Sequence, residues 1–270
     1  MLARSLQASA LRPRLAATSR VLGFRAGDFV AAQPSPSICL RSFASGSFDA
    51  VSELDKTPKT PQGAATLYDA WAQQYDADLS AWGYTAPQES AQLLMSALQE
   101  SVGGSVEKTA SMRLLDVGCG TGLDAMALRA AGFRGQLWGC DLSQESLEVS
   151  RSKGVYSEAP EALFKVDLSH PVTQVADKSL DGIICVGVLS YLTESCDKIF
   201  MDWCRMVKPG GFVCFTHKVA HLEVEPFKTA VTTSSWKLVR KSVPRPYLPG
   251  NKNYGSAEDQ KIIHFLYRVE

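Results

Sequence analysis

The residues best placed to do chemistry form a glycine-rich turn near the middle of the chain. Three glycines stand at alternate positions, Gly118, Gly120 and Gly122, directly after an apolar run that contains Asp116. A strand that stops here and feeds a helix can approach a ligand with its backbone, because a glycine has no Cβ to collide with it. A dinucleotide fingerprint would place the third glycine at position 123 instead. We therefore predict a nucleotide-binding turn of the tighter G-x-G-x-G form.

A second acid lies at the distance that such a turn requires. Residues 135–141 predict a strand that ends in Asp141, about twenty residues after the glycines, and a helix over 123–131 separates the two. A carboxylate there can accept hydrogen bonds from both hydroxyls of a ribose, each worth roughly 1.5–3 kcal/mol. We therefore expect Asp141 to bind a ribose.

Further elements follow in a regular order and predict the rest of a sheet. They are a strand over 162–166 before Asp167 and Leu168, a strand over 180–189, a helix through Trp203, a Lys-Pro-Gly-Gly turn at 208–211 and a strand over 212–216. Residues 235–242 and 261–269 predict two more strands, which would complete the sheet as an antiparallel pair.

These motifs resemble those of the class I S-adenosylmethionine-dependent methyltransferases. The G-x-G-x-G turn after Asp116 is similar to the first motif of that superfamily, and the Lys-Pro-Gly-Gly turn is another of its hallmarks. The resemblance implies an α/β fold, a doubly wound Rossmann-like seven-stranded sheet with helices on both faces. It also implies S-adenosyl-L-methionine as the cofactor, with its adenine amino group held near Asp167 and Leu168.

A longer pattern resembles one group within that superfamily, the Williams–Beuren syndrome critical-region methyltransferase-like proteins. The pattern combines Tyr68-Asp69-x-Trp71-Ala72-x-x-Tyr75-Asp76 with residues 184–192. The aromatic residues share one helical face, which predicts packing, a lid over the methionine end of the cofactor, or both. The cofactor-binding residues that the resemblances imply are Tyr68, Tyr75, Asp116, Gly118, Cys119, Gly120, Asp141, Leu142, Asp167, Leu168 and Val186.

Candidate catalytic residues follow the fourth and fifth strands, because reacting groups gather at the carboxyl ends of a parallel sheet. His217 is a candidate general base and Tyr191 a second pocket residue, although alignment of the reactants makes a dedicated base optional. The Pro- and Gly-rich loop 244–255 either walls the substrate pocket with Tyr247 or Tyr254, or is an ordinary surface loop. His217 and His221 form a short His-x-x-x-His pair, but no third ligand stands at a suitable spacing, so we expect no metal.

The first 44 residues have the composition of a transit peptide. They carry six arginines, no lysine and one acid, Asp28, and the stretch from Arg41 to Phe43 resembles a mitochondrial processing site. We expect a mitochondrial protein, with the chloroplast as the alternative. A disordered basic tail is the structural alternative.

The remaining residues predict one domain that binds small molecules. Residues 45–66 are a predicted linker and 67–270 the domain: 67–104 lid and helix, 113–216 cofactor-binding core, 217–270 C-terminal strands and substrate-side loop. Without the first 44 residues the chain carries 22 basic and 27 acidic residues, a net charge near −5, which disfavours nucleic acid as a partner. The apolar runs are too short to span a bilayer, and the seven cysteines predict buried thiols. We expect a monomer.

Together these features predict methyl transfer to a small organic acceptor whose reacting atom, oxygen, nitrogen or carbon, stays open. The alternatives are a protein methyltransferase, a protein that binds the cofactor without turnover, and a nicotinamide-dependent oxidoreductase. The missing glycine at position 123 argues against the last. The turn after the fourth strand lacks the Asn/Asp-Pro-Pro-Tyr/Phe motif of enzymes that methylate planar amino groups, which disfavours that substrate class.

Overall fold

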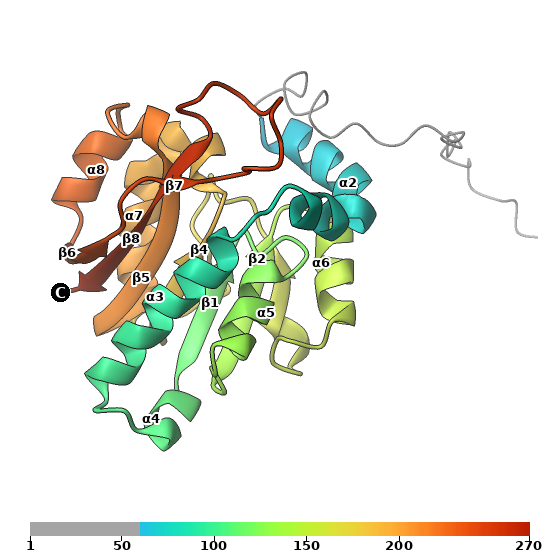
Figure 1. Ribbon diagram of the computed structural model, residues 1–270. Coiled ribbons are helices and arrows are strands. Elements are labelled where there is room, and N and C mark those ends of the chain that lie inside the picture. The colour runs from blue at the N-terminus through green and yellow to red at the C-terminus, as the bar shows by residue number, and fades with distance from the viewer. Residues whose placement is uncertain (1–59) are drawn as a thin grey trace, which may run out of the picture. The chain divides into compact units, whose positions relative to one another are not determined.

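The computed structural model describes residues 60–270 (Figure 1), and the predicted transit peptide lies outside them. The first helices are α2 (Pro61–Ala81), α3 (Ala86–Ser101) and α4 (Val106–Ala110). The central part alternates strands and helices: β1 (Arg113–Val117), α5 (Leu123–Ala130), β2 (Gln136–Asp141), α6 (Gln144–Ser152), β3 (Leu163–Lys165), β4 (Leu180–Cys185) and α7 (Cys196–Met206). The last elements are β5 (Val207–Lys218), α8 (Phe227–Thr233), β6 (Trp236–Lys241), β7 (Arg245–Pro246) and β8 (Lys261–Val269).

One sheet organises the described residues, with the strand order β3-β2-β1-β4-β5-β8-β6. The first five strands of that order are parallel, and β8 runs antiparallel to both β5 and β6. The two-residue strand β7 pairs with β8 outside this path. The predicted doubly wound seven-stranded sheet with a C-terminal antiparallel pair is thereby confirmed.

Helices cover both faces of the sheet (Figure 1). The face under α3 and α5 buries residues such as Leu94, Leu114 and Leu128, and the face under α7 and α8 buries residues such as Phe200, Phe215 and Phe227. Successive side chains of a strand point to opposite faces, so an apolar run such as that of β4 serves both cores. Within residues 60–270, none of the helices has the length and apolarity needed to cross a membrane.

The fourth and fifth strands differ from their predicted bounds. β4 ends at Cys185 rather than at residue 189, because Gly187 has a φ of +78° and a 3₁₀ turn follows over Leu189–Tyr191. β5 begins at Val207, so the Lys-Pro-Gly-Gly segment lies inside the strand and not before it. There a Cβ on Gly211 would lie 2.7 Å from the carbonyl oxygen of Asp181 on the neighbouring strand. Close strand contact thus explains this glycine.

Helix α2 begins six residues before the predicted boundary between linker and domain. Thr60 caps the helix with its hydroxyl, which accepts a hydrogen bond from the Gly63 N–H at 3.1 Å, and Pro61 occupies the first turn. Both features are typical of a helix start, since a side-chain acceptor satisfies a free N–H and proline needs none. Residues 61–66 are therefore helical, and not linker as we expected from their composition.

Candidate functional site

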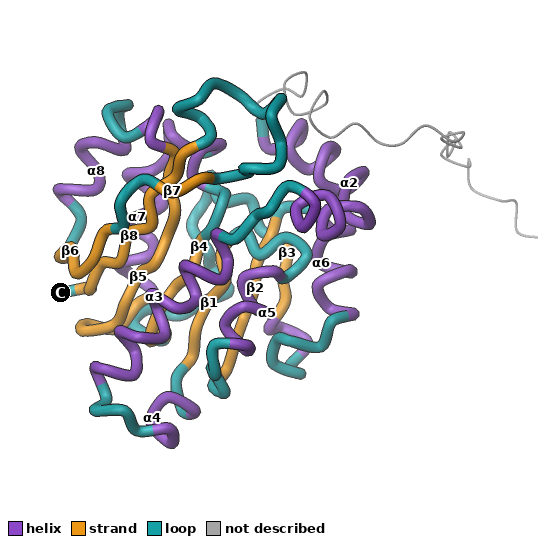
Figure 2. Tube along the Cα trace, in the orientation of Figure 1, coloured by secondary structure: helices purple, strands orange, loops and turns teal. Residues whose placement is uncertain are grey.

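The loops that follow β1, β2 and β4 meet at the carboxyl edge of the parallel strands (Figure 2). Between β1 and α5, Gly118, Gly120 and Gly122 all have positive φ values, of +69°, +49° and +92°. A Cβ on Gly118 would lie 2.3 Å from a methyl carbon of Val188, whereas a Cβ on Gly120 would meet nothing within 4 Å. The turn therefore needs glycine for its backbone shape, and at Gly120 it faces open space that a ligand can fill.

Asp141 stands at the end of β2 and holds this turn from the side. Its Oδ2 accepts the N–H of Gly120 at 2.8 Å, and its Oδ1 accepts the N–H of Ser143 at 2.8 Å. Burial raises the pKa of Asp141, and the hydrogen bonds from Ser143 and Gly120 oppose that shift. A carboxylate oxygen can accept more than one bond, so Asp141 can also receive hydroxyl groups from a ligand.

A cavity opens between this turn, Asp141 and helix α2. Eight of the eleven predicted cofactor-binding residues line it: Tyr68, Tyr75, Gly118, Gly120, Asp141, Leu142, Asp167 and Leu168. Asp167 forms its own turn after β3, where its Oδ1 accepts from the N–H of Ser169 at 2.9 Å. The residues predicted to hold the adenine, the ribose and the methionine end of one cofactor thus share a single cavity, and their individual roles stay predictions.

Three predicted residues, Asp116, Cys119 and Val186, lie behind the cavity and do not line it. Asp116 is fully buried and accepts a hydrogen bond from the hydroxyl of Tyr156 at 2.7 Å. Burial raises its pKa above the usual carboxyl range. Val186 donates its N–H to Asp124 at the start of α5. These three residues lie behind the residues that line the cavity. We expected the backbone near Val186 to face the cofactor, and the next two residues, Gly187 and Val188, line the cavity there.

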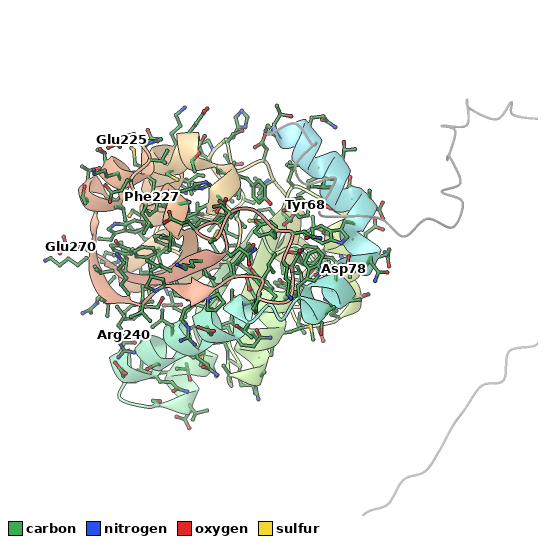
Figure 3. The ribbon with its side chains drawn as sticks, turned by 45° about the horizontal axis from the view of Figure 1, so that its top comes forward. Tyr68, Asp78, Glu225, Phe227, Arg240 and Glu270 are labelled. Carbon is green, nitrogen blue, oxygen red and sulfur yellow. The ribbon has the colours of Figure 1, made fainter. Side chains whose placement is uncertain are left out.

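Helix α2 covers one side of the cavity. Tyr68 and Tyr75 face the cavity, while Trp71, between them, is 2% exposed and packs against Tyr75 with a ring-centroid distance of 4.7 Å. Figure 3 shows Tyr68 on this helix, with Asp78 further along it. The indole N–H of Trp71 donates to Asp78 at 2.7 Å. The aromatic face of α2 therefore packs against the core and also lines the cavity. This agrees with the prediction that the aromatic residues serve both packing and a lid.

Tyr68 and Tyr75 belong to a larger group of tyrosines beside the turn after β4. We call this group the tyrosine cluster: Tyr68, Tyr75, Tyr84, Tyr191, Tyr247 and Tyr254. Tyr68 and Tyr254 each form a side-chain hydrogen bond with Tyr191. The rings of Tyr84 and Tyr247 lie edge to face, with their centroids 5.4 Å apart. The predicted pocket residue Tyr191 lines the cavity and is 37% exposed.

The cluster narrows the space at the turn after β4. The hydroxyls of Tyr84 and Tyr247 each lie 3.1 Å from the position that a Cβ of Gly187 would take. Burial raises the pKa of Tyr68, Tyr75, Tyr84 and Tyr247 well above 10, so these hydroxyls are neutral at physiological pH. The loop 244–255 therefore packs against this turn through Tyr247, which also contacts Tyr254, but none of its residues is among those that line the cavity. Arg245 is exposed and pairs with Glu89 at 2.9 Å.

His217 does not line the cavity. Its buried ring packs against Phe227 of α8 at a centroid distance of 4.1 Å, in the core that Figure 3 marks with the Phe227 label. Burial and the nearby His221 lower its pKa to about 3, so the imidazole is neutral at physiological pH. The prediction that His217 acts as a base gains no support from this position. Among the described residues, no group of three or more His, Cys, Asp or Glu side chains could hold a metal.

The sequence analysis missed part of the cavity wall. The missed residues are Thr60, Pro61, Ala64, Ala65, Leu67, Thr121, Ser143, Ser146, Gly187, Val188 and Leu192. The first five belong to the start of α2, and the cap-and-proline signal of Thr60 and Pro61 was available to find them. Ser143 is the N-cap of α6, a position that serine directly before a helix indicates.

Comparisons with known proteins agree with this geometry. A family model described as "Methyltransferase domain" matches residues 115–215. "Methyltransferase-like protein 27" of Homo sapiens is 35% identical over 150 residues, which cover 56% of this chain and 56% of that protein. "Ubiquinone biosynthesis O-methyltransferase" of Paracidovorax citrulli is 30% identical over 106 residues, or 38% of this chain and 42% of that protein. The chain thus spans about half the length of the curated relatives it matches.

A solved structure matches more of the chain. The TehB-like S-adenosylmethionine-dependent methyltransferase from Corynebacterium glutamicum superposes with a TM-score of 0.52, at 15% identity, over 75% of this chain and 98% of that one. At that identity the likeness shows the fold. The narrower likeness to the Williams–Beuren group stays a prediction. Residues 115–215 of the chain are thus similar to a methyltransferase domain, and the strand order and the glycine turn beside Asp141 agree with that similarity.

Proposed function

We propose that the protein transfers a methyl group from S-adenosylmethionine to a small organic acceptor. The observation that carries this proposal is the single cavity, in which the glycine turn and Asp141 meet three members of the tyrosine cluster, Tyr68, Tyr75 and Tyr191. The first part suits an adenosine moiety, and the second offers a confined, aromatic space next to it. The similar protein of Paracidovorax citrulli is a "Ubiquinone biosynthesis O-methyltransferase", and this name also favours a small acceptor over a protein.

The residues beside the glycine turn fit the ribose of the cofactor. Gly120 faces open space beside the Asp141 carboxylate, so a ribose has both room and an acceptor there. When bound, S-adenosylmethionine supplies an electrophilic methyl group on a sulfonium. The chain's own contribution is to orient the acceptor and exclude water, and orientation alone can supply about 7–11 kcal/mol of the barrier.

The tyrosine cluster constrains the kind of acceptor. Its hydroxyls are neutral because burial raises the pKa of these tyrosines, so they donate and accept hydrogen bonds but do not remove protons at pH 7. Orientation by such groups suits an acceptor atom that is nucleophilic without a general base. The enclosed cluster also favours a small molecule over the protein side chain of the alternative proposal.

Titration and turnover test the proposal in sequence. The full chain is titrated calorimetrically with S-adenosylmethionine, S-adenosylhomocysteine and NAD, and then incubated with S-adenosylmethionine and panels of small amines, thiols and phenols while S-adenosylhomocysteine is measured. We expect binding of the first two ligands and turnover with a small acceptor. Binding of NAD alone would overturn the cofactor, and cofactor binding without turnover on any panel would favour the non-catalytic alternative.

We also propose that the protein is a mitochondrial monomer. Six arginines and a single acid in residues 1–44, with Arg41 two residues before Phe43, support import and processing. Expression of the full chain with a C-terminal tag, followed by fractionation and N-terminal sequencing, tests this proposal. We expect a mitochondrial product that begins near residue 44 and elutes as a monomer; a plastid product or an unprocessed chain would contradict it.

A further inference from the structure

Helix α2 contacts the core through two aspartates as well as through its tyrosines. Oδ1 of Asp69 accepts hydrogen bonds from the hydroxyl of Ser143 at 2.6 Å and from the N–H of Glu145 at 3.2 Å. Oδ1 of Asp76 accepts from the hydroxyl of Thr121 at 2.5 Å, and its Oδ2 pairs with the ammonium of Lys153 at 2.5 Å. The two carboxylates therefore tie the helix to both sides of the cavity.

The two aspartates engage opposite ends of helix α6, which lies beside α2 (Figure 1). Ser143 is the N-cap of α6 and accepts the N–H of Ser146 at 3.0 Å, so Asp69 places a negative charge at the positive end of that helix. Lys153 is the C-cap of the same helix and carries the positive charge that Asp76 meets. Charge and helix polarity thus both favour the observed alignment of α2.

These bonds continue into the cofactor site. Ser143 donates its N–H to Asp141, and Asp141 also accepts the N–H of Gly120. Gly120 is covalently joined to Thr121, whose hydroxyl returns to α2. The contacts therefore form a closed ring through α2, the start of α6, the predicted ribose carboxylate and the glycine turn. A displacement of α2 must disturb groups that face the ligand.

We propose that Asp69 and Asp76 are positioning residues that latch α2 over the cavity and thereby set how slowly the cofactor and its product leave. The inference rests on the proposed cofactor binding. Residues from Thr60 to Tyr75 line one side of the cavity, so movement of α2 would open that side to a ligand that fills the cavity. That movement breaks the bonds of Asp69 and Asp76, which link the helix to α6 and to the glycine turn, as well as the hydrogen bond of Tyr68 with Tyr191.

Dissociation kinetics of S-adenosylhomocysteine from the full chain test the latch. Asp76→Asn and Lys153→Met are compared with the wild type by stopped-flow displacement. We expect each variant to release the ligand about two- to fivefold faster, the range that corresponds to the loss of a partly exposed ion pair. The double variant should release the ligand no faster than Asp76→Asn alone, because Asp76→Asn has already removed the ion pair that Lys153→Met removes.

Asp78→Asn is the matched control, since it makes the same change of charge on the same helix. Asp78 bonds to Trp71 within α2 and so does not tie the helix to the core. We expect its release rate to equal that of the wild type. Equal acceleration by Asp78→Asn would mean that any weakening of α2 speeds release, and it would overturn the latch.

Ionic strength separates an electrostatic latch from a purely structural role. The Asp76–Lys153 pair is partly exposed, with side chains 38% and 18% accessible, so added salt should weaken it. Release from the wild type should therefore accelerate with salt, and release from Asp76→Asn and Lys153→Met should lose that dependence. Unchanged rates and salt dependence in variants that bind the ligand would refute the latch, whereas absence of binding by the wild type would refute the proposed function itself.

Discussion

Replacement of Asp141 by alanine should damage both the empty protein and its cofactor site. In the structure the carboxylate accepts two backbone N–H groups, those of Gly120 and Ser143, each at 2.8 Å. A hydrogen bond to a charged acceptor contributes roughly 1.5–3 kcal/mol. In the alanine variant, water in the cavity can bond to the two freed N–H groups and so recover part of that free energy. We therefore expect Asp141→Ala to lower the free energy of unfolding of the ligand-free protein by about 2–4 kcal/mol.

The affinity for S-adenosylhomocysteine should fall for an additional reason. The ribose hydroxyls lose their acceptor, and the glycine turn loses the bond that fixes Gly120. Loss of a single such bond to the ligand corresponds to about a tenfold rise in Kd, and loss of two to about a hundredfold rise. Asp141→Asn should lie between wild type and alanine, because its amide oxygen still accepts one N–H while its NH₂ group opposes the other.

Calorimetric titration measures the affinity, and urea unfolding of the ligand-free protein measures the stability. Asp177→Ala is a suitable control, since Asp177 is exposed and pairs with Arg205 on the surface at 2.6 Å. A folded Asp141→Ala variant that binds the ligand as tightly as the wild type would refute the ribose assignment. Wild-type stability in that variant would refute the reasoning from its two backbone bonds.

The remaining predictions concern the lid and two buried titratable groups. Tyr75→Ala should weaken S-adenosylhomocysteine binding and also lower the ligand-free Tm, because the contact with Trp71 at 4.7 Å contributes about 0.5–1.5 kcal/mol; an unchanged Tm would contradict the packing. His217→Phe should leave the cofactor affinity intact and should reduce the loss of folding stability between pH 7 and 5. The pKa of His217, about 3, lies below its unfolded value, so the wild type loses stability as the unfolded imidazole gains a proton. Loss of turnover in this variant would restore His217 as a catalytic candidate. Asp116→Asn should change the stability at higher pH instead. Burial raises the pKa of Asp116, so the stability that its protonated carboxyl contributes is present below about pH 4 and is lost as the pH rises through the raised pKa. Urea titrations should therefore show that the variant loses less stability than the wild type between pH 5 and 8.

The sequence predicted those parts of the fold that local pattern determines. The glycine turn, the acid at the end of β2 and the apolar strands follow from backbone geometry and burial, which act over a few neighbouring residues. The bounds of β4 and β5 were wrong where a contact distant in sequence decides them. Gly211 looked like a turn residue, but the carbonyl of Asp181 on the adjacent strand requires a glycine inside the strand there.

The candidate site shows the same division. Asp141 and Gly120 were predictable because one strand and one turn position them, and the structure places both at the cavity. His217 was placed at the right edge by its position after the fifth strand, but the direction of its side chain depends on the packing of Phe227 from α8. The tyrosine cluster joins four separate segments of the chain, so no local pattern could have brought Tyr84 and Tyr247 together at Gly187.

The repeated Tyr-Asp pair of helix α2 shows how one spacing can serve two purposes. Seven residues separate Tyr68 from Tyr75 and Asp69 from Asp76, which is close to two helical turns. Each tyrosine therefore shares a face with the other, and each aspartate lies about 100° further round the helix, on the side that meets α6. A helix that only needed to cover the cavity would require the tyrosines alone. The aspartates at the same spacing add polar contacts to α6 and to the glycine turn, and these are the contacts that the proposed latch must break when a ligand is exchanged.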